Sequence, residues 1–270
     1  MAQPALIVAH PGHELMVLGW VGEMRPRVSI LTDGAGRSGT SRIASSEKLL
    51  SAAGAERGSV WGPVSDPAFY EAILDGDISL FVGLATKLAD WLIETRPPYV
   101  AGDAREGFNP THDLCRLIID AAVRRAEHAG VSVSNFAFTL FAPHENCPSE
   151  LRSRAIWKSL DEAGLARKVA AAKAYPELAA EAEVALTGTS RKILAQHQDL
   201  AAIVDASLDG MGERSLGAEC LMPAALLPPP PGDRPFYELY GERLVAAGTY
   251  QRAIRYRDHV LPIEHALAAL

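Results

Sequence analysis

The stretch that decides the fold is Leu6-Ile7-Val8-Ala9-His10-Pro11-Gly12-His13-Glu14. Its uninterrupted apolar run predicts a strand of a parallel sheet that is buried on both faces. Polar residues begin where the run ends, and ligands of α/β proteins bind at the carboxyl ends of such strands. The stretch therefore predicts an α/β fold with His10, His13 and Glu14 at its functional edge.

Apolar runs and amphipathic segments alternate along the first half of the chain, which predicts parallel strands joined by right-handed helical crossovers. Strands are expected at residues 6–9, 28–32, 60–61, 99–102 and 136–141, and helices at 14–24, 41–55, 81–92 and 113–128. Residues 151–186 are rich in Ala, Glu and Lys, and Pro228–Pro231 predicts an extended connector. We predict one Rossmann-like, three-layer α/β domain with a mostly parallel sheet, with its core at 1–145 and a C-terminal helical elaboration at 146–270.

Composition narrows the classes of function. The 270 residues carry a net charge of −7 and contain no block of five Lys or Arg, which disfavours nucleic-acid binding through phosphate neutralisation. The three cysteines form no C-x-x-C pair, and the chain has no apolar stretch of about 18 residues and no basic segment before its first apolar run. We expect a cytoplasmic protein that acts on a small molecule, with no membrane partner; assembly into a homo-oligomer is left open.

Three histidines follow two of the predicted strands. His10 and His13 come after the first strand, and His112 follows the strand at 99–102 and the polar loop after it. Three neutral imidazoles with one open position form a catalytic zinc site, and each ligating ring needs an acceptor for its second nitrogen. Glu14, Asp103 and Asp113 are the candidate acceptors. The alternative is that His10 and His112 only cap the helices that follow them.

The order of these motifs resembles the PIG-L/LmbE family of metal-dependent de-N-acetylases. The family's Ala-His-Pro-Asp-Asp-Glu corresponds to Ala9–Glu14, its Thr-Asn/Asp-Gly turn to Thr32–Gly34, and its His-Pro-Asp-His to Asn109–His112. The resemblance covers roughly residues 5–145, judged as a pattern. It implies a divalent metal, in the first instance Zn²⁺, held by His10, His13 and His112. It also implies hydrolysis of an N-acetyl group on a sugar or a similar polar small molecule.

Two departures from the family pattern affect the chemistry. Gly12 stands where the family has the aspartate that acts as general base, and Asn109 replaces a histidine that helps to hold the oxyanion. Loss of a positioned base costs a factor of about 10²–10⁴ in rate. We expect Glu14 to accept the proton and Asn109 to donate to the oxyanion, with Arg42, Asp33 and Asp103 contacting the substrate. The alternative is a binding protein that kept the fold and lost catalysis.

A second motif suggests a different class of protein. Gly34–Gly39 spells G-x-G-x-x-G between a predicted strand and a predicted helix, which is the fingerprint of a dinucleotide site and of an oxidoreductase. The motif follows the second strand instead of the first, and its helix begins late, near Ser41. We therefore hold nucleotide binding as the weaker alternative.

Overall fold

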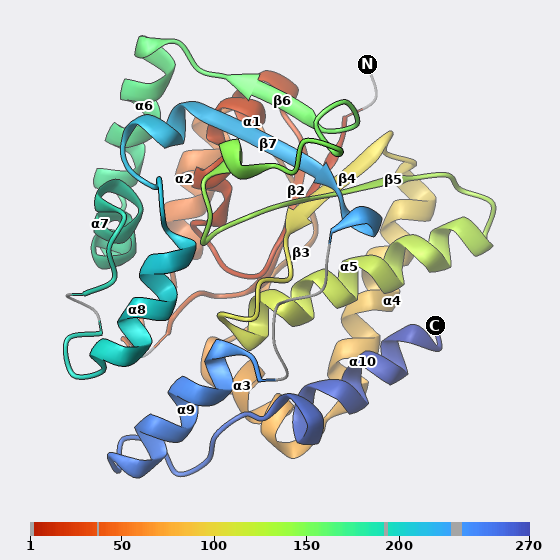
Figure 1. Ribbon diagram of the computed structural model, residues 1–270. Coiled ribbons are helices and arrows are strands. Elements are labelled where there is room, and N and C mark those ends of the chain that lie inside the picture. The colour runs from red at the N-terminus through yellow and green to blue at the C-terminus, as the bar shows by residue number, and fades with distance from the viewer. Residues whose placement is uncertain (1–2, 37, 192–193, 228–233) are drawn as a thin grey trace.

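A seven-stranded sheet with the strand order β3-β2-β1-β4-β5-β7-β6 organises the computed structural model (Figure 1). The structure describes residues 3–36, 38–191, 194–227 and 234–270. The strands are β1 (Ala5–Val8), β2 (Arg27–Thr32), β3 (Glu56–Val64), β4 (Tyr99–Asp103), β5 (Ser134–Phe138), β6 (Ile156–Ser159) and β7 (Ala218–Pro223). β1 to β5 pair in parallel, whereas β7 runs antiparallel to both β5 and β6.

The first strand explains why this sequence forms a three-layer domain. Successive side chains of a strand point to opposite faces of the sheet. In β1, Leu6 and Val8 pack into one apolar cluster and Ala5 and Ile7 into another, and all four are fully buried. Apolar residues at consecutive positions therefore require helices on both faces of the sheet.

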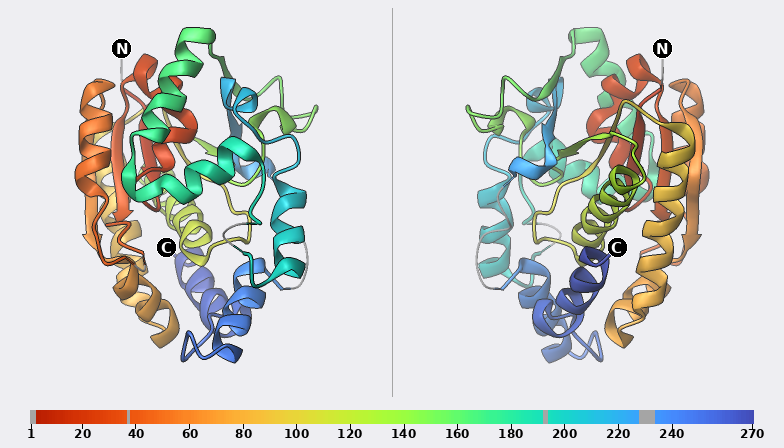
Figure 2. Two further views of the ribbon diagram at one scale, coloured as in Figure 1. Left: turned by 90° about the vertical axis from the view of Figure 1, so that its left-hand side faces the viewer. Right: turned by 90° about the vertical axis from the view of Figure 1, so that its right-hand side faces the viewer.

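Helices cover both faces of this sheet. Those of the structure are α1 (Leu18–Met24), α2 (Ile43–Ala52), α3 (Asp66–Asp75), α4 (Ile78–Thr95), α5 (Pro110–His128), α6 (Glu162–Lys173), α7 (Ala179–Thr187), α8 (Gln198–Ser207), α9 (Phe236–Ala246) and α10 (Leu261–Ala268). α4, α5 and α10 share one apolar cluster with β1, whereas α1 and α2 belong to the cluster of the other face. Figure 1 shows these two layers on either side of the strands, and Figure 2 shows α9 at the lower end of the molecule with α8 above it.

The structure confirms the predicted α/β fold and adds elements that the sequence did not predict. β6 and β7 extend the sheet from within residues 146–270, which were expected to be helical. β6 has only four residues, and the second residue of β7 is the charged Glu219, so neither gives the pattern of a buried strand. The expected helix at 14–24 begins as a 3-10 helix at His13–Val17. The predicted connector Pro228–Pro231 lies outside the described residues.

A buried ion pair ties the C-terminal half of the chain to the first strand–helix connection. The ammonium group of Lys168 on α6 lies 2.9 Å from a carboxylate oxygen of Glu219 on β7 and donates to the carbonyl of Met16 at 2.6 Å. The same carboxylate accepts from the backbone N–H groups of Gly19 and Trp20 at 2.8 and 2.6 Å. Burial lowers the pKa of Lys168, and the charge of Glu219 opposes that shift.

A helix that crosses a bilayer needs about 20 predominantly apolar residues. Among the described residues, none forms a helix with both the length and the apolar character that a membrane crossing requires.

Candidate active site

The candidate site lies where the strand order of the sheet reverses. β1 pairs with β2 on one side and with β4 on the other, so the chain builds β2 and β3 outward and then returns to begin the other half at β4. The carboxyl ends of strands at such a switch point border the crevice in which doubly wound proteins bind ligands. His10 follows β1, Thr32 ends β2, and Asp103 ends β4.

Three imidazole rings meet at this edge. The centroid of the His10 ring lies 5.2 Å from that of His13 and 5.1 Å from that of His112, and the His13 and His112 centroids are 4.5 Å apart. His10 and His112 are only 7% and 8% exposed. The structure thus brings together the three histidines that the sequence predicted as ligands, from two segments about 100 residues apart.

Acceptors behind two of these rings determine which ring nitrogen carries the proton. His10 Nδ1 lies 2.7 Å from Thr32 Oγ1 and 3.0 Å from Asp66 Oδ1. Because a carboxylate only accepts, Nδ1 carries the proton and Nε2 keeps its lone pair. Burial alone would raise the pKa of Asp66, but the hydrogen bond from His10 lowers that pKa well below the usual range.

His13 is held in the same way by Asp103. The Asp103 side chain is fully buried, and its Oδ2 accepts from His13 Nδ1 at 2.9 Å and from the backbone N–H of Ala9 at 2.8 Å. The carboxylate at the end of β4 therefore fixes both the end of β1 and the orientation of the His13 ring.

His112 occupies the first turn of α5. Asn109 caps this helix, with its side-chain oxygen accepting from the N–H of Thr111, and Pro110 begins it. Burial lowers the pKa of His112 well below its usual value, and the nearby His13 and His10 lower it further. The ring is therefore neutral at pH 7, which is the form that binds metals.

Three neutral imidazoles are donors of the kind that zinc prefers, and their ring centroids have about the spacing of a zinc site. With Zn–N bonds of about 2.0–2.1 Å and tetrahedral angles, the centroids of three imidazoles stand roughly 5 Å apart. In the described part of the chain, no hydrogen bond engages Nε2 of His10 or His13, or either nitrogen of His112. Within the same ranges, however, no group of three or more His, Cys, Asp or Glu side chains is placed so that it could hold a metal ion. The rings are adjacent, but their donor atoms do not yet converge as a bound ion would require.

Asp103→Asn tests the contact behind His13. We expect the affinity for Zn²⁺ to fall about 10- to 100-fold, because the neutral amide no longer makes the imidazole a stronger ligand. Competition with a chromophoric chelator measures that affinity. Asp120→Asn, on the half-exposed part of α5, is the matched control and should leave it unchanged. If both substitutions lowered the affinity for Zn²⁺ equally, Asp103 would have no specific role in the zinc site.

The structure gives Glu14 internal partners. Its carboxylate accepts from the N–H of Gly12 at 2.8 Å and from the hydroxyl of Ser46, which also lies 3.0 Å from the hydroxyl of Tyr175. Burial raises the pKa of Glu14 above its ordinary value, although the bond from Ser46 opposes the shift. Glu14 therefore supports the loop that carries His10 and His13, and its role as a proton acceptor stays a prediction.

The position of Gly12 is closed to a larger side chain. Its φ of 106° lies in the left-handed region that favours glycine. A Cβ atom there would lie 2.1 Å from Cδ1 of Leu178, which precedes α7. The C-terminal part of the chain thus fills the space that a side chain at position 12 would enter.

Two hydrogen-bond donors hold the side-chain oxygen of Asn109. That oxygen accepts from the N–H of Thr111 at 2.8 Å and from the hydroxyl of Tyr70 at 3.2 Å. Since both partners donate to the oxygen, the amide nitrogen keeps its two protons for another acceptor. This orientation is compatible with the predicted donation to an oxyanion.

The residues predicted to contact substrate make internal contacts as well. Asp33 Oδ1 accepts from the N–H groups of Ala35 and Asp66 at 2.9 and 3.1 Å, and Asp103 supports His13. Arg42 forms an ion pair with Glu181 of α7 across 3.3 Å. Contact between any of them and a substrate stays a prediction.

The glycine-rich loop is poorly suited to hold a phosphate. In Gly34–Gly39, the N–H of Ala35 is taken by Asp33 and that of Gly36 by Asp66 at 2.8 Å. Carboxylates thus occupy two amides that would otherwise face a nucleotide, which disfavours the oxidoreductase alternative. Arg37 lies outside the described residues.

Asp66 contacts His10 in the site, and the sequence did not indicate this role. It begins α3 directly after β3, and Ser65 caps the helix. The signal available was Ser65-Asp66-Pro67, a helix start at the end of a third neighbouring strand. Asp113, considered as an acceptor for a histidine, instead accepts from the N–H groups of Glu106 and Gly107 at 3.1 and 3.0 Å.

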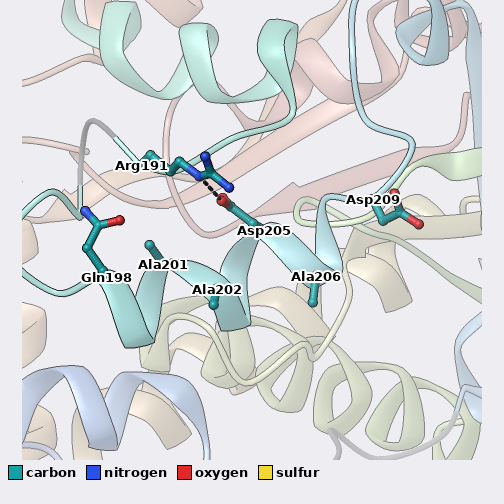
Figure 3. Close-up of a pocket in the computed structure, with 7 residues that line it drawn as sticks. All are labelled: Arg191, Gln198, Ala201, Ala202, Asp205, Ala206 and Asp209. Carbon is teal, nitrogen blue, oxygen red and sulfur yellow. Dashed lines mark ion pairs between the residues drawn. The ribbon is translucent and has the colours of Figure 1, made fainter.

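A surface hollow of about 560 Å³ lies elsewhere, along α8 (Figure 3). It is lined by Arg191, Gln198, Ala201, Ala202, Asp205, Ala206 and Asp209. Arg191 and Asp205 form an ion pair across 3.4 Å, which Figure 3 marks with a dashed line. No predicted site residue is among those that line the hollow. The hollow therefore does not belong to the three-histidine site.

Comparison with known proteins supports the fold. No protein-family model matches the sequence, and no curated protein matches it. Among solved structures, the fold is similar to the zinc-inhibited form of teicoplanin deacetylase Orf2, with a TM-score of 0.50 and 13% identity over 82% of this chain and 97% of that one. The conserved protein TT1542 from Thermus thermophilus has a TM-score of 0.44 and 18% identity over 84% and 97% of the two chains. At these identities the likeness to Orf2 establishes the α/β fold alone.

Proposed function

We propose that this protein is a zinc-dependent amide hydrolase that removes the acetyl group from an N-acetylated amine, such as an amino sugar. The observation that carries the proposal is the meeting of three imidazoles, two of them backed by the carboxylates of Asp66 and Asp103. Carboxylate–histidine pairs of this kind orient the ligands of zinc sites. The fold of a deacetylase among its structural neighbours agrees with the proposal.

The proposed roles follow from the hydrogen bonds of the site. His10, His13 and His112 would hold the zinc ion, which when bound supplies Lewis acidity toward an amide carbonyl and toward water. Asn109 donates from its amide nitrogen to the carbonyl oxygen as negative charge develops there. Glu14 takes up a proton on its carboxylate, whose pKa burial raises above its ordinary value.

A specific observation favours a second candidate, a metal-binding protein without hydrolytic activity. Leu178 closes the space above Gly12, and both carboxylate oxygens of Glu14 already accept hydrogen bonds. If no carboxylate reaches the attacking water, the same three histidines would bind zinc without turnover.

Zinc content and acetate release, measured on the same untagged protein, separate the two candidates. For the hydrolase we expect one zinc ion per chain and acetate release from N-acetylated amino sugars. Glu14→Gln should lower kcat about 10²- to 10⁴-fold with zinc content unchanged. Protein without zinc would refute both candidates, and zinc without acetate release would leave the second. Unchanged turnover in Glu14→Gln would show that another group accepts the proton.

A further inference from the structure

A row of aromatic rings begins at the three-histidine site and ends on α9. The ring of His112 stacks on Phe141 with centroids 6.2 Å apart, and Phe141 lies 4.6 Å from Phe108. Phe108 lies 5.5 Å from Phe236, which stacks on Tyr240 at 5.7 Å. We call Phe141, Phe108, Phe236 and Tyr240 the aromatic row.

The four rings come from the elements that border the site. Phe108 lies in the connection between β4 and α5, Phe141 follows β5, and the other two rings project from α9. The N–H of Tyr237 donates to the carbonyl of Gly107 at 3.3 Å, which fixes the start of α9 to the loop that carries Phe108. The row is therefore held in place by backbone contacts as well as by ring packing.

Phe236 and Tyr240 lie on a face of α9 other than the one that carries its buried apolar residues. α9 buries Tyr237, Gly241 and Leu244 on one face. Phe236 and Tyr240 are four residues apart and share a different face, since side chains at i and i+4 lie one above the other. All four rings of the row stay partly exposed although they pack against the apolar cluster around α8. Each ring therefore keeps part of its surface in contact with water beside the polar three-histidine site, and ligand sites are lined by aromatic side chains with a few polar groups.

We propose that the aromatic row binds an aryl group or another flat apolar group attached to the N-acetylated amine. This inference rests on the proposed function for the position of the amide at the histidines. Its own basis is the continuity of the row with His112, which places an apolar part of the same molecule beside its reacting end. The substrate class is then an N-acetyl amine that carries an aromatic substituent, in contrast to a free polar sugar.

Binding of a matched pair of compounds tests the row without relying on turnover. The probes are 4-methylumbelliferyl N-acetyl-β-D-glucosaminide and free N-acetylglucosamine, titrated calorimetrically. We expect the aryl compound to bind about 10-fold more tightly to the unaltered protein. Phe236→Ala should remove about 3- to 10-fold of that preference, with the affinity for N-acetylglucosamine and the zinc content unchanged.

Two further variants make the result specific to the ring. Tyr250→Ala removes an exposed aromatic outside the row and should leave the preference intact. Phe236→Leu keeps an apolar side chain for packing and should still lower the preference, so it replaces Phe236→Ala if that variant does not fold. Equal affinities for the two probes, or equal effects of the changes at 236 and 250, would overturn the inference.

The same titration on protein purified without a chelator, with its zinc content and acetate release measured, distinguishes this inference from the proposed function. An aryl preference that depends on Phe236, in a protein that neither retains zinc nor releases acetate, would refute the hydrolase and keep the row as a binding site. Acetate release with no aryl preference would refute the row alone.

Discussion

His112→Ala is expected to abolish zinc binding at the stoichiometric level and acetate release with it. Changes behind a metal ligand already cost about 10- to 100-fold in affinity, so loss of a ligand itself should cost at least about 100-fold. The side chain is held in the first turn of α5 and is 8% exposed. Among the described residues, no fourth histidine ring contacts His10 or His13 and could replace it. Elemental analysis and chelator competition measure the loss.

His128→Ala is the matched control, because it removes a histidine from the exposed C-terminal end of the same helix. It should leave zinc affinity and turnover unchanged. The three-histidine assignment fails if the His112 variant retains one zinc ion per chain at the affinity of the unaltered protein.

Lys168→Met is expected to lower the free energy of unfolding by about 3–5 kcal/mol, because it leaves the buried carboxylate of Glu219 without its cation. The two side chains are only 4% and 1% exposed, so water cannot replace the lost partner without local opening. The N–H groups of Gly19 and Trp20 would still hold the carboxylate, but the carbonyl of Met16 would lose its donor. Urea denaturation followed by circular dichroism measures the change.

Lys158→Met supplies the comparison for the same chemical change at the surface. Lys158 pairs with the largely exposed Glu23, and such pairs contribute less than about 1 kcal/mol. If the two lysine variants lost the same stability, the buried pair would not be a main connection between the C-terminal half and the first loop.

The parts of the fold that depend on local pattern were predictable. The run Leu6–Ala9 indicated β1, and its position before His10 indicated the functional edge, because burial on both faces demands continuous apolar residues. β6 and β7 were not predictable in the same way. Ile156–Ser159 is too short to show a period, and Glu219 is buried only because Lys168 and two amides compensate its charge.

The residues of the candidate site also fall into those that a local sequence pattern indicates and those that it does not. His10 and His13 could be selected because they follow a predicted strand, and His112 because it stands after the loop that follows another. The contact of Leu178 with Gly12 could not, since it joins segments far apart in the sequence and has no local signature. Asp66 was missed for a related reason: only the pairing of β3 beside β2 brings the residue after β3 to His10.

The bond between Gly19 and Glu219 spans 200 residues of sequence. Chains fold as they emerge from the ribosome, N-terminal segments first. During synthesis, the segment that bears His13 therefore leaves the exit tunnel long before the carboxylate that anchors the following helix has been made. Nascent chains stalled before residue 219 should consequently expose that segment to proteases, whereas chains extended beyond β7 should protect it.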